Sequence, residues 1–600
     1  MDKPSILIYD GACGICREWV DYWRCISGPG VKYQPYQEVA EDHPDISQQE
    51  FEAAVQLVAA DGSRYRGARA CLELYRNKAL YVLFIRLYKY LPGFALISES
   101  CYNFLSRHRG LLAFFTHLFW GRGFRPAEFH LTTWVFLRLL GLIYCSAFLS
   151  LYVQITGLIG TDGILPLANY LDAARNTLGN AAYYRMPMIF WLHCSNGFLQ
   201  FVCLAGAVLS LFVVFNFLSR TALLVMYILY LSLVYGGQQF MSFQWDMLLL
   251  EAGFLALFLY RGSHITIWLY RWLVFRFMFL GGMVKILSHD PTWRNLTALH
   301  FHFETQPLPS PLAWYAHHLP DFLLNSAVAA TLLIEIVIPF LIFTPRRFRM
   351  FAACCIIVFQ SCIILTGNYN FFNLLTITLC LFLFDDAALQ NLLPSFLIKR
   401  ITAVTIPPVK KTATVLLSLF AALVIYSSSE QLILVLRQDN SHEPSVLTRW
   451  LAPLQIINNY GPFAVMTTLR YEIQIEGSYD KQHWLAYEFK YKPDDPGKAL
   501  SWNIPHQPRL DWQMWFAALS SPDSNIWFQN LLLRLLQNKK DVTGLFAHNP
   551  FPERAPTFIR ARFYEYHFTT PQERETSGNI WQRQLVAEYY PVVSLKTNSR

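Results

Sequence analysis

The 600-residue sequence has few charged residues, and this shortage excludes a wholly soluble protein. Asp, Glu, Lys and Arg make up 15% of the chain, whereas hydrophobic residues make up 54% and aromatic residues 16%. Soluble globular domains carry about 25% charged residues, so this chain lacks the charge to cover its whole surface with polar groups. The mean hydropathy of +0.27 agrees. The same composition excludes disorder, collagen and coiled coil.

Cysteine is scarce and unevenly placed. The chain holds 12 cysteines and none after Cys380, which excludes a secreted disulfide scaffold. Cys13 and Cys16 lie near the N-terminus, so thiol chemistry is expected at that end, with membrane-embedded cysteines such as Cys194 and Cys203 as the alternative. The net charge of +8 is not gathered into a dense basic stripe, and we therefore expect no nucleic-acid partner.

Long apolar runs between residues 131 and 436 predict a polytopic, all-α membrane domain in contact with the lipid bilayer. A helix needs about 20 apolar residues to cross the hydrocarbon core. The nine candidate runs are 131–153, 197–217, 221–240, 245–260, 265–287, 322–343, 350–366, 369–385 and 412–436. The fourth, seventh and eighth are short for a crossing, so we expect about nine helices.

Basic residues favour one orientation of these helices. Loops that retain Lys and Arg stay in the cytoplasm, and with the N-terminus inside the basic residues fall mainly in cytoplasmic segments. These residues are Arg122, Arg125, Arg220, Arg261, Arg346, Arg347, Arg349, Lys399, Arg400, Lys410 and Lys411. An odd number of crossings then places the C-terminal domain outside the cytoplasm.

The N-terminal segment has the pattern of a thiol redox site. A short apolar strand at 6–10 leads into a turn that contains Cys13 and Cys16, and a helix follows. A thiolate at a helix N-terminus is stabilised by the helix dipole, and a second cysteine one turn later can resolve a mixed disulfide. A metal site would need another Cys/His pair, which the segment lacks. The alternative is a pair of cysteines that only packs or holds a stray metal.

The residues from Tyr9 to Cys16, Tyr-Asp-Gly-Ala-Cys-Gly-Ile-Cys, resemble the opening motif of the thiol-disulfide oxidoreductase DCC family. Asp61-Gly62 and Arg66-Gly67-Ala68 extend this resemblance. It implies a thioredoxin-like α/β domain over 1–118, with Cys13 as attacking thiol, Cys16 as resolving thiol and Asp10 beside them. A thiol redox partner is then expected. The redox-active disulfide would need no cofactor and no metal, and nothing in the sequence supports a quinone.

Charged residues inside the apolar runs mark a second set of candidates, because such groups are costly in a bilayer and face the protein interior. Asp246 and Glu251 lie in the fourth run, and Arg276 and Lys285 lie in the fifth. Arg276 is placed to pair with a carboxylate of the fourth run. Such a pair would either fix helix packing or line a functional cavity.

The predicted outer loop, 288–320, carries three alternating polar residues: His300, His302 and Glu304. On a strand they would share one face, as a metal set or an acid–base group would require. The simpler interpretation, which we favour, is a loop anchored by aromatic residues at the membrane interface.

A longer resemblance covers about residues 125–595 and is to the lipase maturation factor family. The segments that carry it are 157–166, 244–246, 275–279, 296–300, 304–311, 459–463, 470–477 and 509–519. Animal members of that family are endoplasmic-reticulum membrane proteins that help secreted lipases to fold. The resemblance implies a protein that assists maturation of an exported client, with a lipase as the first candidate. The fused thiol domain suggests a bacterial relative, in an inner membrane, and coupling of the two parts stays open.

Two alternatives remain for the membrane domain. Residues 281–285, ending in Lys285, are distantly similar to the transmembrane domain of vitamin K-dependent carboxylases, which implies a membrane enzyme with Lys285 as base. The simpler interpretation is a lysine that snorkels to the interface. A transporter built around Asp246, Glu251 and Arg276 is the other alternative, although the chain lacks the internal repeats common in carriers.

Residues 437–600 predict an α+β domain of β-sandwich character. Strands are expected at 470–476, 484–492, 559–568 and 585–590, and helices at 512–519 and 526–536. The three predicted domains are therefore 1–118, 125–436 and 437–600. Exposed aromatic residues on the last would suit an apolar client.

Overall fold

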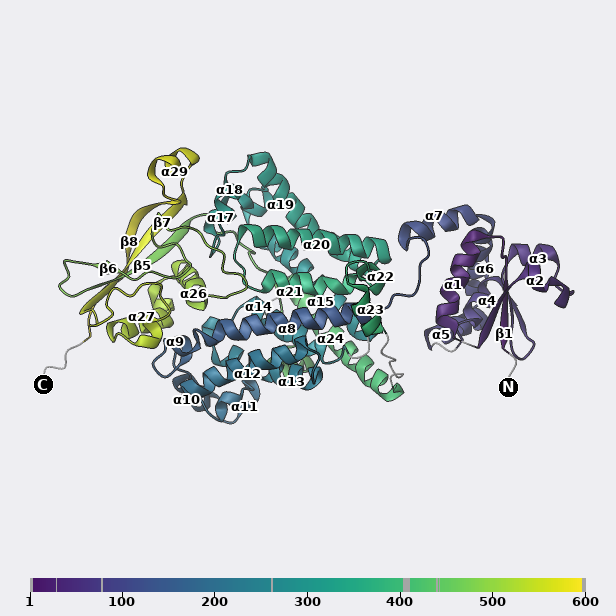
Figure 1. Ribbon diagram of the computed structural model, residues 1–600, viewed down its shortest axis with the longest axis horizontal. Coiled ribbons are helices and arrows are strands. Elements are labelled where there is room, and N and C mark those ends of the chain that lie inside the picture. Colours follow the sequence, from purple (N-terminus) through teal and green to yellow (C-terminus); the bar gives the residue numbers. More distant parts are fainter. Residues whose placement is uncertain are drawn as a thin grey trace. The chain divides into compact units, whose positions relative to one another are not determined.

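The computed structural model describes residues 4–28, 30–76, 79–259, 263–402, 410–438, 441 and 443–595. The chain divides into two compact units: the first is Met1–Glu128 with Thr344–Met350, and the second is Phe129–Phe343 with Phe351–Arg600 (Figure 1). Arg261, one of the basic residues used to predict orientation, lies outside the described residues.

The first unit is an α/β domain built on a four-stranded sheet, as predicted. Its strands are β1 Ser5–Tyr9, β2 Val31–Pro35, β3 Gln56–Val58 and β4 Arg64–Arg66, in the order β2-β1-β3-β4. β1 is parallel to β2 and antiparallel to β3, and β3 is antiparallel to β4. The helices are α1 Gly14–Ser27, α2 Tyr36–Val39, η1 Ala40–Asp42, α3 Gln48–Ala53, α4 Gly67–Glu73, α5 Ala79–Tyr90, α6 Pro92–Arg107 and α7 Arg109–Phe119.

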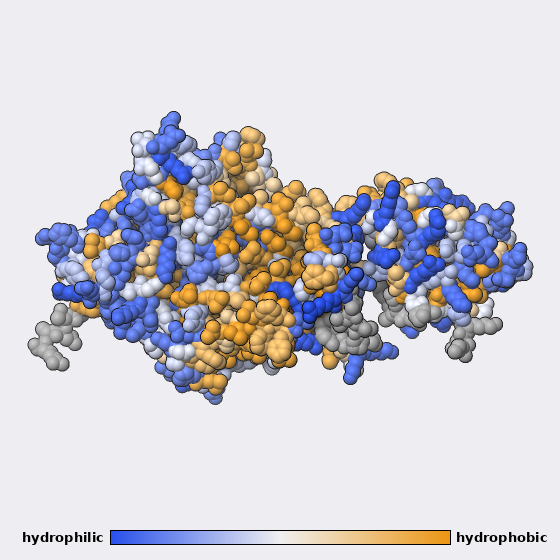
Figure 2. All heavy atoms as spheres, in the orientation of Figure 1, coloured by the Kyte–Doolittle hydropathy of each residue, from blue (hydrophilic) through white to orange (hydrophobic). Residues whose placement is uncertain are grey.

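Among the described residues, seven helices are long and apolar enough to cross a membrane. They are α8 His130–Tyr152, α12 Asn196–Val214, α13 Ser219–Gly236, α15 His264–Leu287, Asp321–Phe343 (α19 Asp321–Ile336 with η5 Ile338–Phe343), α20 Arg346–Thr366 and α24 Lys411–Arg437. Space-filling shows apolar surface gathered over this helical region (Figure 2). The membrane domain is thus confirmed, whereas the expected count of about nine helices, three of them short for a crossing, is not.

Two of the nine predicted spans are short helices in the structure. They are α14 Gln244–Ala256 and α21 Phe372–Leu379, which η6 Cys380–Leu383 extends. At 1.5 Å per residue, the 13 residues of α14 reach about 20 Å, less than the roughly 30 Å hydrocarbon core. Their residues are nearly all buried in protein, so they need not meet the length that lipid contact demands.

Hydrogen bonds at the ends of these short helices show which part of the protein each end contacts. α14 begins beside the C-terminal region, where Gln244 accepts a hydrogen bond from the Gly461 amide (3.0 Å). Beyond its other end, the Phe258 carbonyl accepts from Thr266, near the start of α15 (2.9 Å). η6 likewise ends near the start of α15, since the Phe382 carbonyl accepts from Arg271 (2.9 Å).

Close helix packing in the bundle depends on small residues and on one capping carboxylate. The Asp386 carboxylate accepts hydrogen bonds from the backbone amides of His130 (2.7 Å), Leu131 and Thr132. These amides form the N-terminus of α8, where a negative charge stabilises the helix. A Cβ at Gly206 of α12 would overlap the ring of Phe148 of α8, so glycine is needed there.

The connections outside the spans are also helical. They comprise α9 Ile155–Ile159, α10 Leu167–Leu178, α11 Ala181–Arg185, η2 Ile189–Trp191, η3 Gln238–Met241, α16 Pro291–Arg294, α17 Ala298–Thr305, α18 Ala313–His317, α22 Asp386–Leu389, α23 Ser395–Thr402, α25 Val446–Leu451 and η7 Ala452–Leu454. The strand considered for His300–Glu304 is therefore wrong, because that segment is α17.

The C-terminal region contains one antiparallel sheet of order β6-β5-β7-β8. The strands are β5 Arg470–Ser478, β6 Leu485–Ala486, β7 Phe558–Phe568 and β8 Trp581–Val593, and the helices are α26 Arg509–Ala518, η8 Pro522–Ser524, α27 Ile526–Leu536, α28 Lys540–Thr543 and α29 Pro571–Ser577. A sandwich requires two packed sheets, and the described part of this region has one. The expected sandwich character is therefore wrong. The predicted strand at 484–492 is reduced to β6, because Glu488 leaves β5 and forms a bridge with His548 instead.

Candidate functional site

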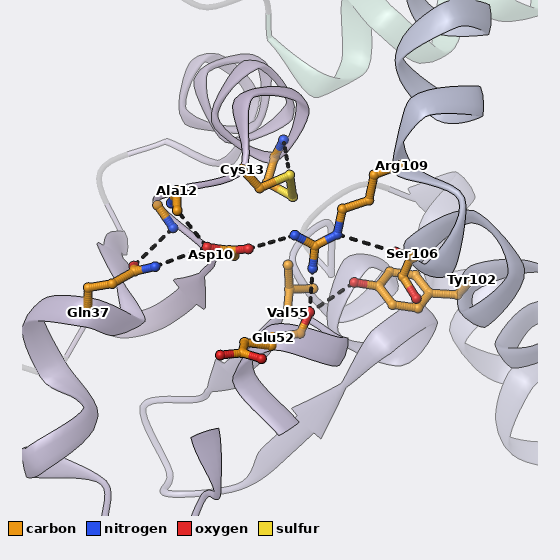
Figure 3. Close-up of a disulfide and its surroundings, with 11 residues drawn as sticks. Asp10, Ala12, Cys13, Gln37, Glu52, Val55, Tyr102, Ser106 and Arg109 are labelled. Carbon is orange, nitrogen blue, oxygen red and sulfur yellow. Dashed lines mark hydrogen bonds and ion pairs between the residues drawn. A yellow bond between two sulfur atoms is a disulfide. The ribbon is translucent and has the colours of Figure 1, made fainter. Parts of the chain in front are cut away.

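The two cysteines of the predicted thiol site form a disulfide at the start of α1 (Figure 3). Strand β1 ends at Tyr9, a tight turn follows, and Cys13 becomes the N-cap of α1. Its sulfur accepts a hydrogen bond from the backbone amide of Cys16 (3.3 Å). The cap position and the helix dipole both favour a thiolate at Cys13 when the pair is reduced.

Asp10 lies next to the disulfide and is held by three donors. Its carboxylate accepts from Arg109 (2.6 Å), from the Gln37 amide (3.0 Å) and from the Ala12 backbone (3.0 Å). Burial alone would raise the pKa of this carboxyl, but these hydrogen bonds, Arg109 first, outweigh burial and leave the pKa below its usual value. Asp10 is therefore an anion at neutral pH.

Sequence reasoning missed Arg109, which lies 99 positions after Asp10. It opens α7 and also donates to the backbone carbonyls of Glu52 and Ser106 (Figure 3). No motif or spacing connects Arg109 to the cysteines, so only the fold brings this cation to the thiol site.

A cavity of about 580 Å³ lies beside the thiol site, within the first unit. Asp10, Cys16 and Arg109 line part of it, and aromatic residues such as Trp19 and Tyr102 line the remainder. A redox partner can therefore present an apolar group next to Cys16.

The charged residues of the fourth and fifth predicted spans form two separate ion pairs. Arg276 pairs with a carboxylate of the fourth run, as expected, and this carboxylate is Glu251, which also accepts from the Tyr460 hydroxyl (2.6 Å). Asp246 instead pairs with Arg509 of α26 through two hydrogen bonds, of 2.6 and 2.8 Å. Both pairs connect the membrane helices with the C-terminal region.

Lys285 is paired as well. Its ammonium group donates to Glu335 of α19 (2.7 Å) and to the Gly281 carbonyl (2.9 Å). Both side chains of the pair are at least nine-tenths buried. The structure therefore gives this lysine a carboxylate partner inside the protein, and the snorkelling interpretation is wrong, because the side chain is buried.

The three polar residues of the predicted outer loop point to different partners. His300 contacts Asn325 (2.8 Å), His302 contacts the Tyr369 hydroxyl (3.4 Å), and Glu304 accepts from the backbone amide of Phe568 (3.0 Å). They diverge because consecutive residues of α17 are rotated around a helix. Within the described ranges, no group of three or more His, Cys, Asp or Glu side chains is arranged to hold a metal ion.

Glu304 also belongs to a small acid–base cluster with the C-terminal sheet. His567 of β7 lies 3.3 Å from Glu304 and 2.8 Å from Glu565. Burial lowers the pKa of His567, but the hydrogen bond with Glu565 and the charge of Glu304 outweigh it, so the net pKa is raised. Arg470 of β5 donates hydrogen bonds to the backbone carbonyls of Glu304 and Gln306, and these bonds link α17 to the sheet.

The first unit is an α/β domain with a disulfide at a helix N-terminus. A bundle of apolar helices follows, and a sheet domain is bound to this bundle. These features define a polytopic membrane protein with a thiol redox domain. Residues 131–391 match the lipase maturation factor transmembrane domain, 456–591 match the lipase maturation factor C-terminal domain, and 7–114 match the DCC1-like thiol-disulfide oxidoreductase. The chain belongs to the lipase maturation factor family.

Relatives in animals cover most of the chain. Lipase maturation factor 2 of Gallus gallus is 37% identical in an alignment that covers 78% of this chain and 82% of the relative. The Homo sapiens protein of the same name is 36% identical over 77% of this chain and 82% of its own length. Lipase maturation factor 1 of Mus musculus is 34% identical over 78% of this chain and 89% of its own. These relatives give no support to the bacterial membrane expected from the sequence. No solved structure matches the chain.

Proposed function

We propose that this protein assists the folding of an exported client, of which a lipase is the first candidate, and that Cys13 and Cys16 exchange disulfides with a protein partner. The observation that carries the proposal is the combination of the family match over the membrane and C-terminal regions with a disulfide at the N-terminus of α1. The names of the relatives supply the client class.

The thiol domain would work by exchange through a mixed disulfide. The Cys13 thiolate attacks a partner disulfide, one partner thiolate leaves, and the Cys16 thiolate then displaces the partner from Cys13. The partner is reduced by two electrons and the Cys13–Cys16 disulfide re-forms; the reverse sequence oxidises a partner dithiol. The strand order β2-β1-β3-β4 supports a thioredoxin-like fold for this domain, and the boundary at residue 118 lies one residue before the end of α7.

The membrane topology that we propose has nine passes, with α14 and α21 as short crossings inside the bundle. The contacts at both ends of α14, and those at the end of η6, support it. Nine passes place the two termini on opposite sides, and the basic loops favour a cytoplasmic N-terminus. The thiol domain and the C-terminal region would then act in different compartments.

Trapping tests the redox half of this proposal. Cys16→Ser should retain the reactive Cys13 but lack the group that resolves the mixed disulfide, so a covalent complex with the partner should accumulate on non-reducing gels. Cys13→Ser is the matched control and should trap nothing. Equal yields of trapped protein from both variants, or none from either, would show that the pair does not perform exchange.

Secretion tests the maturation half separately. Cells that lack the protein should secrete a lipase of lower specific activity, and the full chain should restore it. A deletion that leaves the activity and amount of each secreted lipase unchanged would remove the client class from the proposal, whatever the outcome of trapping.

A further inference from the structure

A cavity of about 450 Å³ lies where the membrane helices meet the C-terminal region. Its size is within the usual range for small-molecule sites. Lys285 of α15 and Glu335 of α19 line it from the membrane side, and the segment 461–467 and Trp512 of α26 line it from the other. This cavity is separate from the thiol site and is not used by the proposed exchange chemistry.

Hydrogen bonds hold the segment 461–467 over the cavity near both of its ends and in its middle. The Gly461 amide donates to Gln244 (3.0 Å), the Phe463 carbonyl accepts from the Trp293 indole (3.1 Å), and the Met466 amide donates to Asp290 (2.7 Å). The wall that it provides is therefore a built part of the fold.

The cavity walls are mainly aromatic. Trp245, Phe277, Trp293, Phe372 and Phe463 are among the side chains that line it. Such walls favour an apolar body over water, because water in the cavity would lack hydrogen-bond partners along most of its surface.

Side chains from two helices that are only slightly buried within the protein also line the cavity. Thr331 of α19, and Phe359 and Ile363 of α20, belong to its wall and are partly exposed. In each of these two helices only 28% of the apolar stretch is buried inside the protein, against 72% in α15. In a bilayer the exposed faces of these helices contact acyl chains, so the nearest apolar molecule is a membrane lipid.

The polar groups in the cavity carry no net charge. Lys285 and Glu335 cancel each other. Burial first, and then the charge of Lys285, lower the pKa of His302 to about 4, so its imidazole is neutral at pH 7. Gln360 and Asn373 are amides bonded to each other (2.6 Å). An anionic or cationic head group would find no counter-charge here.

One donor is available to an uncharged head group. A lysine ammonium has three N–H donors, and among the described residues the hydrogen bonds of Lys285 use two of them, to Glu335 and Gly281. Its nitrogen also lies 5.2 Å from the centre of the Trp293 ring in the cavity wall, a contact that takes up no hydrogen-bond acceptor. The third can be satisfied by an ester carbonyl or a hydroxyl of a ligand.

We propose that this cavity binds a membrane acyl lipid with an uncharged ester head group, such as a monoacylglycerol. Its acyl chain enters beside Thr331 and Ile363, and its ester carbonyl accepts a hydrogen bond from Lys285.

Photolabelling of the full chain in lipid nanodiscs tests this site. The probe is a monoacylglycerol with a diazirine in its acyl chain and an alkyne for detection, and labelled peptides are mapped by mass spectrometry. Label is expected on segment 461–467 and on the cavity side of α19 and α20. Thr331→Trp and Ile363→Trp, which fill the cavity from two helices, should each reduce label on 461–467 at least about fivefold.

The matched controls are Leu333→Trp and Leu365→Trp, two positions further along the same helices, at side chains that are 51% and 49% exposed. They should leave the label on 461–467 unchanged, and thermal unfolding of all four variants reports whether each is folded. Equal labelling in all four folded variants would mean contact with surrounding lipid only and would overturn the site. A phosphorylated, anionic form of the probe should label 461–467 at least about fivefold less; equal labelling would overturn the uncharged head group.

Discussion

Arg509→Met should detach the C-terminal region from the membrane helices more readily than any exposed change in the same region. Arg509 is 1% exposed and Asp246 is fully buried, and the pair is joined by two hydrogen bonds. Arg509 also donates to the Phe240 carbonyl (2.9 Å). In the variant, Asp246 keeps the Tyr230 hydroxyl as its donor among the described side chains.

The expected magnitude follows from the cost of leaving a buried charge without its partner, about 3–5 kcal/mol. Each 1.4 kcal/mol corresponds to about a factor of ten in an equilibrium constant. If α26 opens locally, its amide hydrogens should exchange about two to nearly four powers of ten faster than in the unmodified protein.

Hydrogen exchange with mass spectrometry, on the full chain in nanodiscs, measures this change peptide by peptide. The matched control is Arg449→Met, which breaks an ion pair with Glu443 whose side chains are 52% and 79% exposed. An exposed pair contributes about 0–1 kcal/mol, so exchange around Arg449 should change less than about tenfold.

A second variant separates the unpaired charge from the loss of side-chain packing. Arg509→Met with Asp246→Leu removes both charges, and replacing a buried pair by apolar residues is often close to neutral. The double variant should regain at least about tenfold protection relative to Arg509→Met. The reasoning fails if the double variant exchanges as fast as the single one, or if Arg449→Met has an effect as large as that of Arg509→Met.

Three further predictions concern helix packing, pH and the thiol site. Gly206→Ala should lower the melting temperature through overpacking, by about 1–3 kcal/mol of stability, whereas Gly197→Ala on the same helix, where a Cβ meets nothing within 4 Å, should not. The pKa of His567 is raised in the folded protein, so the stability that its protonated form contributes is complete below about pH 6.5 and is lost as the pH rises through the folded-state pKa. His567→Gln should therefore lower the melting temperature at about pH 5.5 and have little effect at about pH 9. Equal effects at the two pH values would refute this assignment. Arg109→Leu removes a cation beside the thiol site and should slow alkylation of reduced Cys13 at neutral pH; an unchanged rate would show that Arg109 does not influence the thiolate.

Local patterns in the sequence predicted the elements whose side chains alternate or repeat over many residues. The helix expected at 526–536 is α27 with the same limits, and the strand expected at 470–476 lies within β5. The alternation of His300, His302 and Glu304 covers too few residues to decide between strand and helix, and packing of α17 against α19 and the sheet determines the outcome.

Long-range pairing could not be predicted in the same way. A pair of Arg276 with a carboxylate of the neighbouring run was predicted, although not which one, whereas the partners of Asp246 and Asp10 are 263 and 99 positions away. Their side chains meet only after the chain has folded. Span length alone could not decide the number of crossings, since the length rule applies to helices that face lipid and α14 is surrounded by protein.

The proposed separation of the thiol site and the C-terminal region is tested most directly by cysteine accessibility in sealed, right-side-out cells or vesicles. The C-terminal region has no cysteine of its own, so Ser524→Cys supplies a single exposed thiol there, to be compared with reduced Cys13. A membrane-impermeant maleimide should label position 524 before permeabilisation and Cys13 only afterwards. Labelling of both thiols before permeabilisation, or of neither, would contradict an odd number of passes.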